Sequence, residues 1–183
     1  IDRALLSAAH SRKLALDGKV LSFIPFSAQR RRTEASLSYE GHTLRVMKGA
    51  LRTVAELAGL EESTIAALGA QANIDARKGL RTLAVAGAET IGPWQLVGVA
   101  LLADPLRPDS RALIDKLHAL GVTIKMLTGD ALPVACEIAH NLGLRNIERA
   151  PDLRQAIERK DPDAERRIKA SDGFAEVFPD RVY

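Results

Sequence analysis

An apolar, β-branched segment that runs directly into the sequence Thr-Gly-Asp is the feature that most constrains the fold of this chain. Residues 122–127 have the composition of a buried strand, and a helical pattern begins just after Thr128, Gly129 and Asp130. In open α/β sheets, ligands bind beyond the carboxyl ends of strands, where the next helix begins and its first N–H groups favour anions. A hydroxyl, a glycine and a carboxylate at such a corner predict a site for phosphate and its metal ion.

The composition is that of an ordinary globular protein and excludes several functional classes. The 183 residues are 46% hydrophobic and 27% charged, with a formal net charge of only +3, which does not by itself indicate nucleic acid. Aromatic residues make up 4%, which leaves little surface for stacking bases. The longest apolar run, residues 96–103, is far shorter than the roughly 20 residues of a membrane helix. We therefore expect a soluble protein without a nucleic-acid partner.

The metal-binding and redox residue types are sparse. Cys136 is the only cysteine, so an internal disulfide is excluded, and its helical surroundings predict a packed thiol in a reducing compartment. The 4 histidines lie far apart and lack the spacing of metal ligands, which argues against a zinc site.

The first half of the chain has the pattern of an antiparallel α+β module that ends near residue 92. Alternating or apolar segments predict strands at residues 21–26, 35–39, 43–47 and 83–86, with a hairpin turn at 40–42. Helical patterns cover residues 4–16, 51–58 and 61–78, and Gly79 ends the last of them.

The second half alternates between strands and helices. We expect strands at residues 94–102, 122–127 and 174–178. Helices are expected at residues 110–120, 132–143 and 153–169. This alternation implies parallel pairing with right-handed crossovers, as in part of a doubly wound α/β domain. Because the chain begins at Ile1 and stops just after a strand-like segment, both ends are expected to be cuts in a longer protein.

Five short motifs, in this order, resemble the cytoplasmic part of P-type cation-transporting ATPases. They are Phe26 with the basic run Arg30-Arg31-Arg32, then Lys48-Gly49-Ala50, residues 79–85, residues 104–107 and Thr128-Gly129-Asp130. Each motif alone is weak, but five in the order of the family are specific, and together they cover nearly the whole chain. Residues 92–98, residues 131–132 and residues 172–179 are most similar to the proton-pumping subfamily.

The resemblance implies a fold and a parent protein. Residues 1–92 would form an α+β nucleotide-binding domain, an antiparallel sheet with flanking helices. Residues 93–183 would form part of an α/β haloacid-dehalogenase-like (Rossmann-like) phosphorylation domain. The parent would be a membrane pump that uses ATP and Mg²⁺ and forms an aspartyl-phosphate, and this fragment would lie at the cytoplasmic face. The Asp-Lys-Thr-Gly-Thr acceptor motif, the metal motif and the membrane helices are absent from the sequence, so we expect the fragment alone to be inactive and to supply no metal site.

The resemblance also implies roles for single residues in nucleotide binding. Phe26 would stack on adenine, and Arg31 would contact the triphosphate, with Arg30 or Arg32 as alternatives. Arginine suits phosphate because its planar fork forms paired, charge-assisted hydrogen bonds. The other implied contacts come from four residues: Lys48 to phosphate or ribose, Arg81 to phosphate oxygens, Gly49 through close backbone approach, and Asp2 to the adenine amino group.

In the second module, Thr128 and Gly129 match donors to the transferring phosphoryl group, where positioning and charge neutralisation dominate catalysis. Asp130 would organise the phosphorylation loop or the metal neighbourhood, and it could also cap the following helix. Asp104 belongs to the hinge motif, in which Leu106 replaces a proline of the family.

One departure from the family lies near the end of the chain. Val182 stands where the family has a lysine that steadies the phosphoryl group, and either Arg181 substitutes with a shift of one residue or catalytic competence is reduced. Two alternatives to the pump stay open. One is a soluble phosphatase of the haloacid dehalogenase type, with its own nucleophilic aspartate. The other is a nucleotide-sensing module that transfers no phosphate.

Overall fold

The computed structural model describes residues 2–14 and 18–177, so Arg181 and Val182 lie outside the described residues. Contacts within the chain divide it into two units. One unit combines Ile1–Asp75 with Arg81–Leu102, and the other combines Ala76–Leu80 with Ala103–Tyr183.

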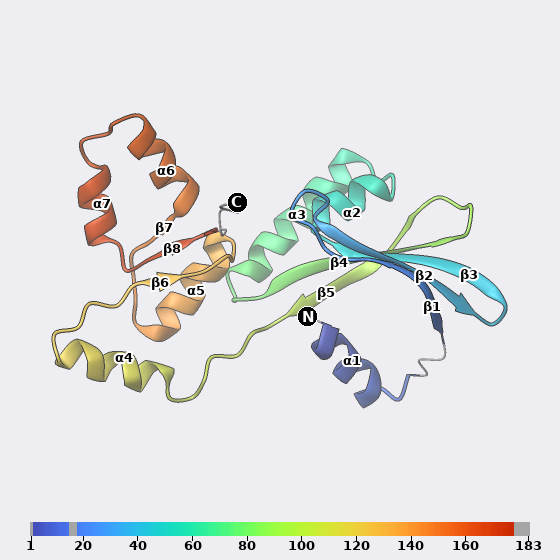
Figure 1. Ribbon diagram of the computed structural model, residues 1–183, viewed down its shortest axis with the longest axis horizontal. Coiled ribbons are helices and arrows are strands. Elements are labelled where there is room, and N and C mark those ends of the chain that lie inside the picture. Colours follow the sequence, from blue (N-terminus) through green and yellow to red (C-terminus); the bar gives the residue numbers. More distant parts are fainter. Residues whose placement is uncertain (1, 15–17, 178–183) are drawn as a thin grey trace. The chain divides into compact units, whose positions relative to one another are not determined.

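The first unit is built on a five-stranded antiparallel sheet (Figure 1). Its strands follow the chain in space, in the order β1 (Lys19–Ile24), β2 (Arg32–Tyr39), β3 (His42–Gly49), β4 (Arg81–Glu89) and β5 (Gln95–Leu102). The hairpin expected between β2 and β3 is confirmed. Glu40 and Gly41 link Tyr39 to its partner His42 with φ values of +49° and +80°. Two positive φ angles in a two-residue loop match the right-handed twist of the flanking strands.

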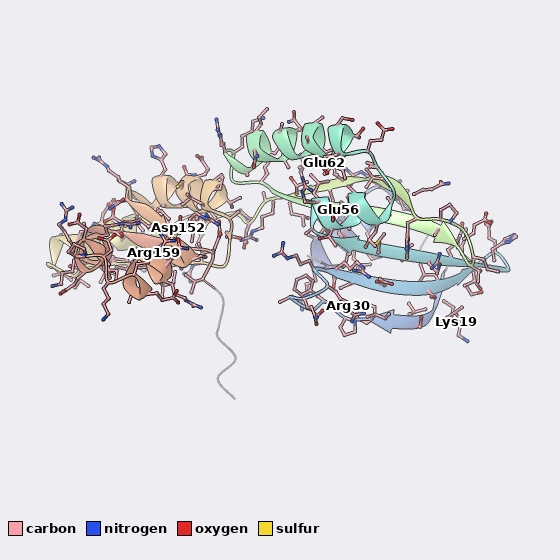
Figure 2. The ribbon with its side chains drawn as sticks, turned by 90° about the horizontal axis from the view of Figure 1, so that it is seen from above. Lys19, Arg30, Glu56, Glu62, Asp152 and Arg159 are labelled. Atoms are coloured by element: carbon pink, nitrogen blue, oxygen red, sulfur yellow. The ribbon has the colours of Figure 1, made fainter. Side chains whose placement is uncertain are left out.

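Helices flank this sheet on both faces. The helices α2 (Leu51–Leu57) and α3 (Glu62–Ala76) lie over one face, and α1 (Asp2–Ser11) lies over the other (Figure 1). Glu56 and Glu62 mark the α2 and α3 layer when the unit is seen from above (Figure 2). The buried cluster under α2 consists of Met47, Val54, Ala84 and Ala86.

The strand β5 belongs to the first sheet, past the boundary that the sequence predicted near residue 92. It pairs with β4 over almost its full length, from Arg81 opposite Leu102 to Gly87 opposite Gln95. The Gly92-Pro93 segment is therefore a connection between paired strands. The Arg45 side chain holds this connection, since its Nη2 donates to the carbonyl of Gly92 at 2.7 Å and its guanidinium lies 4.7 Å from the Trp94 ring centroid.

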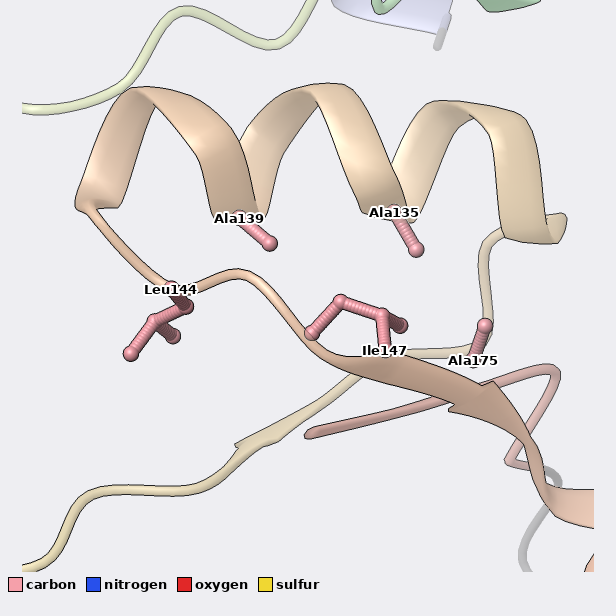
Figure 3. Close-up of a cluster of buried hydrophobic side chains, with 5 residues drawn as sticks. All are labelled: Ala135, Ala139, Leu144, Ile147 and Ala175. Atoms are coloured by element: carbon pink, nitrogen blue, oxygen red, sulfur yellow. The ribbon is translucent and has the colours of Figure 1, made fainter. Parts of the chain in front are cut away.

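The second unit contains a three-stranded parallel sheet in the order β6 (Met126–Leu127), β8 (Gly173–Ala175) and β7 (Ile147–Arg149). The expected parallel pairing is thus confirmed for β6 with β8, whereas β5, which was expected in the same set of strands, pairs antiparallel with β4, and β7 was not predicted. Its helices are α4 (Ser110–Ala119), α5 (Leu132–Leu142), α6 (Ala150–Glu158) and α7 (Ala164–Ala170). The buried core joins α5 to the sheet through Ala135, Ala139, Leu144, Ile147 and Ala175 (Figure 3).

Three elements of this unit differ from the sequence prediction. The single helix expected over residues 153–169 is wrong: α6 ends at Glu158 and α7 begins at Ala164, because Pro162 lacks an N–H and disfavours helix before it. The strand expected over residues 122–127 shrinks to β6, which has one strand neighbour among the described residues. The final strand ends at Ala175 because Glu176 adopts a φ of +56°.

We predict that Gly49→Ala lowers the free energy of unfolding by about 1–3 kcal/mol, the usual cost of overpacking. A Cβ atom at Gly49 would lie 2.6 Å from the Cβ atom of Arg32 and 2.8 Å from its Cα atom. Gly98→Ala in β5 is the matched control, because its Cβ would meet nothing within 4 Å. Urea denaturation of both variants checks the prediction, and equal midpoints would contradict it.

Candidate functional site

The register of β3 against β4 decides which side chains share a face of the first sheet. Met47 lies opposite Ala86, and both are buried on the face that α2 covers. Side chains alternate along a strand, so Lys48, which lies opposite Val85, points to the other face. Arg81 shares that other face with Val85, because the two residues are four positions apart in β4. Two cationic side chains predicted to bind nucleotide therefore lie on one face.

Lys48 is a partly buried residue among the predicted cationic contacts. Its side chain is 26% exposed, and its ammonium forms an ion pair with the carboxylate of Asp2 in the first turn of α1. Partial burial lowers the pKa of Lys48 because desolvation disfavours the charged form. The structure thus brings two predicted site residues, Asp2 and Lys48, into direct contact.

Gly49 and Arg31 also lie together, through their backbones. The carbonyl of Arg31, a residue with a φ of +52°, accepts a hydrogen bond from the N–H of Ala50 at 3.0 Å. This turn occupies the space beside the Cα atom of Gly49, which explains locally why a glycine stands there. The guanidinium of Arg32, by contrast, is paired with Glu34 at 2.7 Å.

Phe26 lies beyond the strand that was expected to end with it. The strand β1 stops at Ile24, before Pro25, and Phe26 is 62% exposed. A ring this exposed retains a face for stacking. Phe26 lies outside the hydrogen-bonded strands of the sheet, so no neighbouring strand fixes the orientation of its ring.

In the second unit, Thr128, Gly129 and Asp130 follow β6 directly. The Thr128 hydroxyl donates to a carboxylate oxygen of Asp130 at 3.0 Å and accepts the Asp130 N–H at 3.1 Å. Backbone hydrogen bonds join this corner to the end of β8, from Val177 to the Thr128 carbonyl at 2.9 Å and from Glu176 to the Asp130 carbonyl at 2.9 Å. The corner is therefore held by its own side chains and by the neighbouring strand.

Asp130 does not cap α5, so that alternative is wrong. The N-cap residue is Ala131, and it provides no side-chain hydrogen bond. Asp104 is exposed in the irregular segment between β5 and α4. Cys136 is also exposed, although the sequence predicted a packed thiol, and partial burial raises its pKa.

Glu176 is the residue of this corner that sequence reasoning missed. Its carboxylate accepts two hydrogen bonds from Arg149, from Nε at 3.0 Å and from Nη2 at 2.7 Å. The Arg149 hydrogen bonds, followed by the Arg149 charge and the N–H of Leu132 at the start of α5, lower the pKa of Glu176. No local pattern reveals this role, because it requires a left-handed backbone and an arginine from another strand.

Within residues 2–14 and 18–177, no group of three or more His, Cys, Asp or Glu side chains lies close enough to hold a metal ion. In the same ranges, no helix combines the length and the apolar character needed to cross a bilayer.

Comparison with known proteins places this geometry in a family. The family model for haloacid dehalogenase-like hydrolases matches residues 11–174, and the chain belongs to that family.

Among individual proteins, the chain is similar over its whole length to P-type cation ATPases. It is 34% identical over 192 residues to a protein of Methanocaldococcus jannaschii named as a cation-transporting ATPase. It is 34% identical to plasma membrane ATPase 2 of Schizosaccharomyces pombe and 35% identical to plasma membrane ATPase 2 of Saccharomyces cerevisiae, each over 195 residues. All of this chain is covered in each alignment, but it spans only 23%, 19% and 21% of the respective relatives.

The lowered pKa of Glu176 leads to a prediction on stability. Its folded pKa lies below the ordinary value of 4.5, so its contribution is complete above that value and is lost as the pH falls through the folded pKa. We expect Glu176→Gln to lower the free energy of unfolding by about 1 kcal/mol at pH 7, typical of a partly exposed charged pair. Urea denaturation should show the difference between the two proteins shrinking as the pH falls below 4.5. A difference that persists unchanged at acid pH would contradict the assignment.

Proposed function

We propose that this chain is the cytoplasmic ATP-binding part of a P-type ATPase. The first unit would bind ATP, and the second would supply one wall of the phosphorylation site. The parent protein would couple ATP hydrolysis, through an aspartyl-phosphate formed outside these 183 residues, to the transport of a cation across a membrane. The similarity of residues 92–98 and 172–179 to the proton-pumping subfamily favours the proton as that cation.

The observation that carries the proposal is the common sheet face of Lys48 and Arg81. Two cations on one face suit the phosphates of a nucleotide, since charge-assisted hydrogen bonds are the strong ones. Arg31 would add a further phosphate contact, because within the described part of the chain its side chain forms no ion pair. Phe26 would stack on the base, and Asp2 would accept a hydrogen bond from the adenine amino group. Gly49 would let the backbone of this turn approach the nucleotide.

The second unit supports the transfer step through its corner. The Gly129 N–H would donate to a phosphoryl oxygen. The Thr128 hydroxyl donates its single hydrogen to Asp130 at 3.0 Å, and it would exchange that acceptor for a phosphoryl oxygen when phosphate binds. The strand bearing the acceptor aspartate would pair with the edge of β6 that faces away from β8. Asp104 would belong to the hinge that leads into this unit. Mg²⁺ would be held by phosphate oxygens and water, and would neutralise charge on the phosphates.

The soluble-phosphatase alternative needs an aspartate directly after a parallel strand. Within the described residues, β6, β7 and β8 are followed by Thr128, Ala150 and Glu176. This observation disfavours a self-contained phosphatase.

We predict that ATP titrated into this chain shifts the amide NMR signals of Lys48 and Arg81, with a dissociation constant on the order of millimolar, about −4 kcal/mol. Lys48→Ala should weaken binding about fivefold, because it removes a charge-assisted contact worth about 1 kcal/mol. Lys19→Ala, which removes a lysine at the exposed start of β1, is the matched control and should leave binding unchanged. The absence of any shift at about ten times the expected dissociation constant would refute nucleotide binding.

The role of Phe26 can be separated from that of the cations. Stacking on a base is worth about 1–3 kcal/mol. Phe26→Ala should therefore weaken ATP binding roughly five- to a hundredfold and leave the binding of inorganic tripolyphosphate unchanged. NMR titration with both ligands measures this. Equal losses for the two ligands would show that Phe26 acts on the fold of the site and not on the base.

A further inference from the structure

The ion pair between Asp2 and Lys48 joins an exposed group to an enclosed one. The Asp2 side chain is 73% exposed, whereas that of Lys48 is 26% exposed. The residues of α1 are exposed or partly buried, and none is fully buried. The charged contact links the start of α1 to the sheet face that carries Lys48 and Arg81.

A partly desolvated ammonium gains most from an anionic neighbour, because burial raises the cost of its charge. In this structure that neighbour is the Asp2 carboxylate. A phosphate oxygen that approached Lys48 would seek the same N–H donors.

We propose that Asp2 is an internal competitor for Lys48 and thereby sets the affinity of this face for polyphosphate chains such as those of nucleoside di- and triphosphates. The inference rests on the proposed nucleotide site and adds the sign of the change in affinity that follows when the charge of Asp2 is removed. A role of Asp2 limited to the adenine amino group predicts that neutralising its charge weakens or preserves ATP binding. Competition for Lys48 predicts that the same change tightens it.

The test is the variant Asp2→Asn, titrated with ATP, inorganic tripolyphosphate and adenosine while amide NMR signals are followed. The asparagine keeps a side-chain oxygen for the adenine amino group but loses the charge that holds Lys48. An exposed ion pair contributes roughly 0.2–1 kcal/mol, so we expect ATP and tripolyphosphate to bind roughly 1.4- to fivefold more tightly. Adenosine, which has no phosphate, should bind no more tightly than to the unsubstituted chain.

Glu62→Gln is the matched control. Glu62 also lies in the first turn of a helix, α3, and pairs with Arg52 at 2.5 Å, but it lies on the helical layer over the opposite face (Figure 2). Either substitution raises the formal net charge by one from +3, so a general electrostatic effect would appear in both variants. A change confined to Asp2→Asn therefore reports on the local pair.

A second measurement guards against a merely structural effect of releasing α1. Asp2→Asn is repeated in the Lys48→Ala background. There the ammonium for which Asp2 and phosphate compete is missing, so Asp2→Asn should no longer tighten the binding of ATP or tripolyphosphate. Tightening that persists there, or that extends equally to adenosine, would overturn the proposal. So would ATP binding by Asp2→Asn that equals or falls below that of the unsubstituted chain, and this result would leave the nucleotide site itself intact. If neither protein binds ATP or tripolyphosphate, both the site and the competition are refuted.

Discussion

The antiparallel pairing of β3 with β4 is the constraint on which the candidate nucleotide face depends. Met47 and Ala86 are opposite each other and are buried under α2, so the hydrophobic effect favours the observed register of β3 against β4. A slip of one residue would carry every side chain of β3 to the other face. Lys48 would then leave the face of Arg81 and enter the core. The burial of Met47 and Ala86 thus keeps the charged side chains of Lys48 and Arg81 on one face of the sheet.

In the second unit, the short central strand β8 has the equivalent role. Gly173 lies between β6 and β7, where a Cβ atom would come within 2.9 Å of the Met126 side chain and 3.0 Å of Ile147. The close approach lets a three-residue strand pair on both sides. From its end, Glu176 and Val177 bond to the backbone of Asp130 and Thr128. The conformation of the corner is therefore set by a strand that lies far from it in the sequence.

The sequence predicted the features that depend on local chemistry. The hairpin turn after Tyr39 and the parallel pairing of β6 with β8 followed from turn residues and strand–helix alternation. Pro162 is a local signal for the break between α6 and α7, but the charged pattern on both sides of it predicted one continuous helix. The membership of β5 in the first sheet was not predictable from its composition, because an apolar strand fits either unit. Contacts such as Asp2 with Lys48 and Glu176 with Arg149 join residues from separate elements, which periodicity does not reveal.

The two units share a physical principle in the way they hold their charged groups. Lys48 is neutralised by Asp2, Glu176 by Arg149, and the Asp130 carboxylate receives the Thr128 hydroxyl. Each pairing satisfies a polar group that would otherwise be costly to leave alone at a partly buried position. A ligand that binds at either place must therefore exchange one set of contacts for another, and its net gain is the difference between them. Affinity at such sites depends as much on the strength of the internal pair as on the number of cations offered to the ligand.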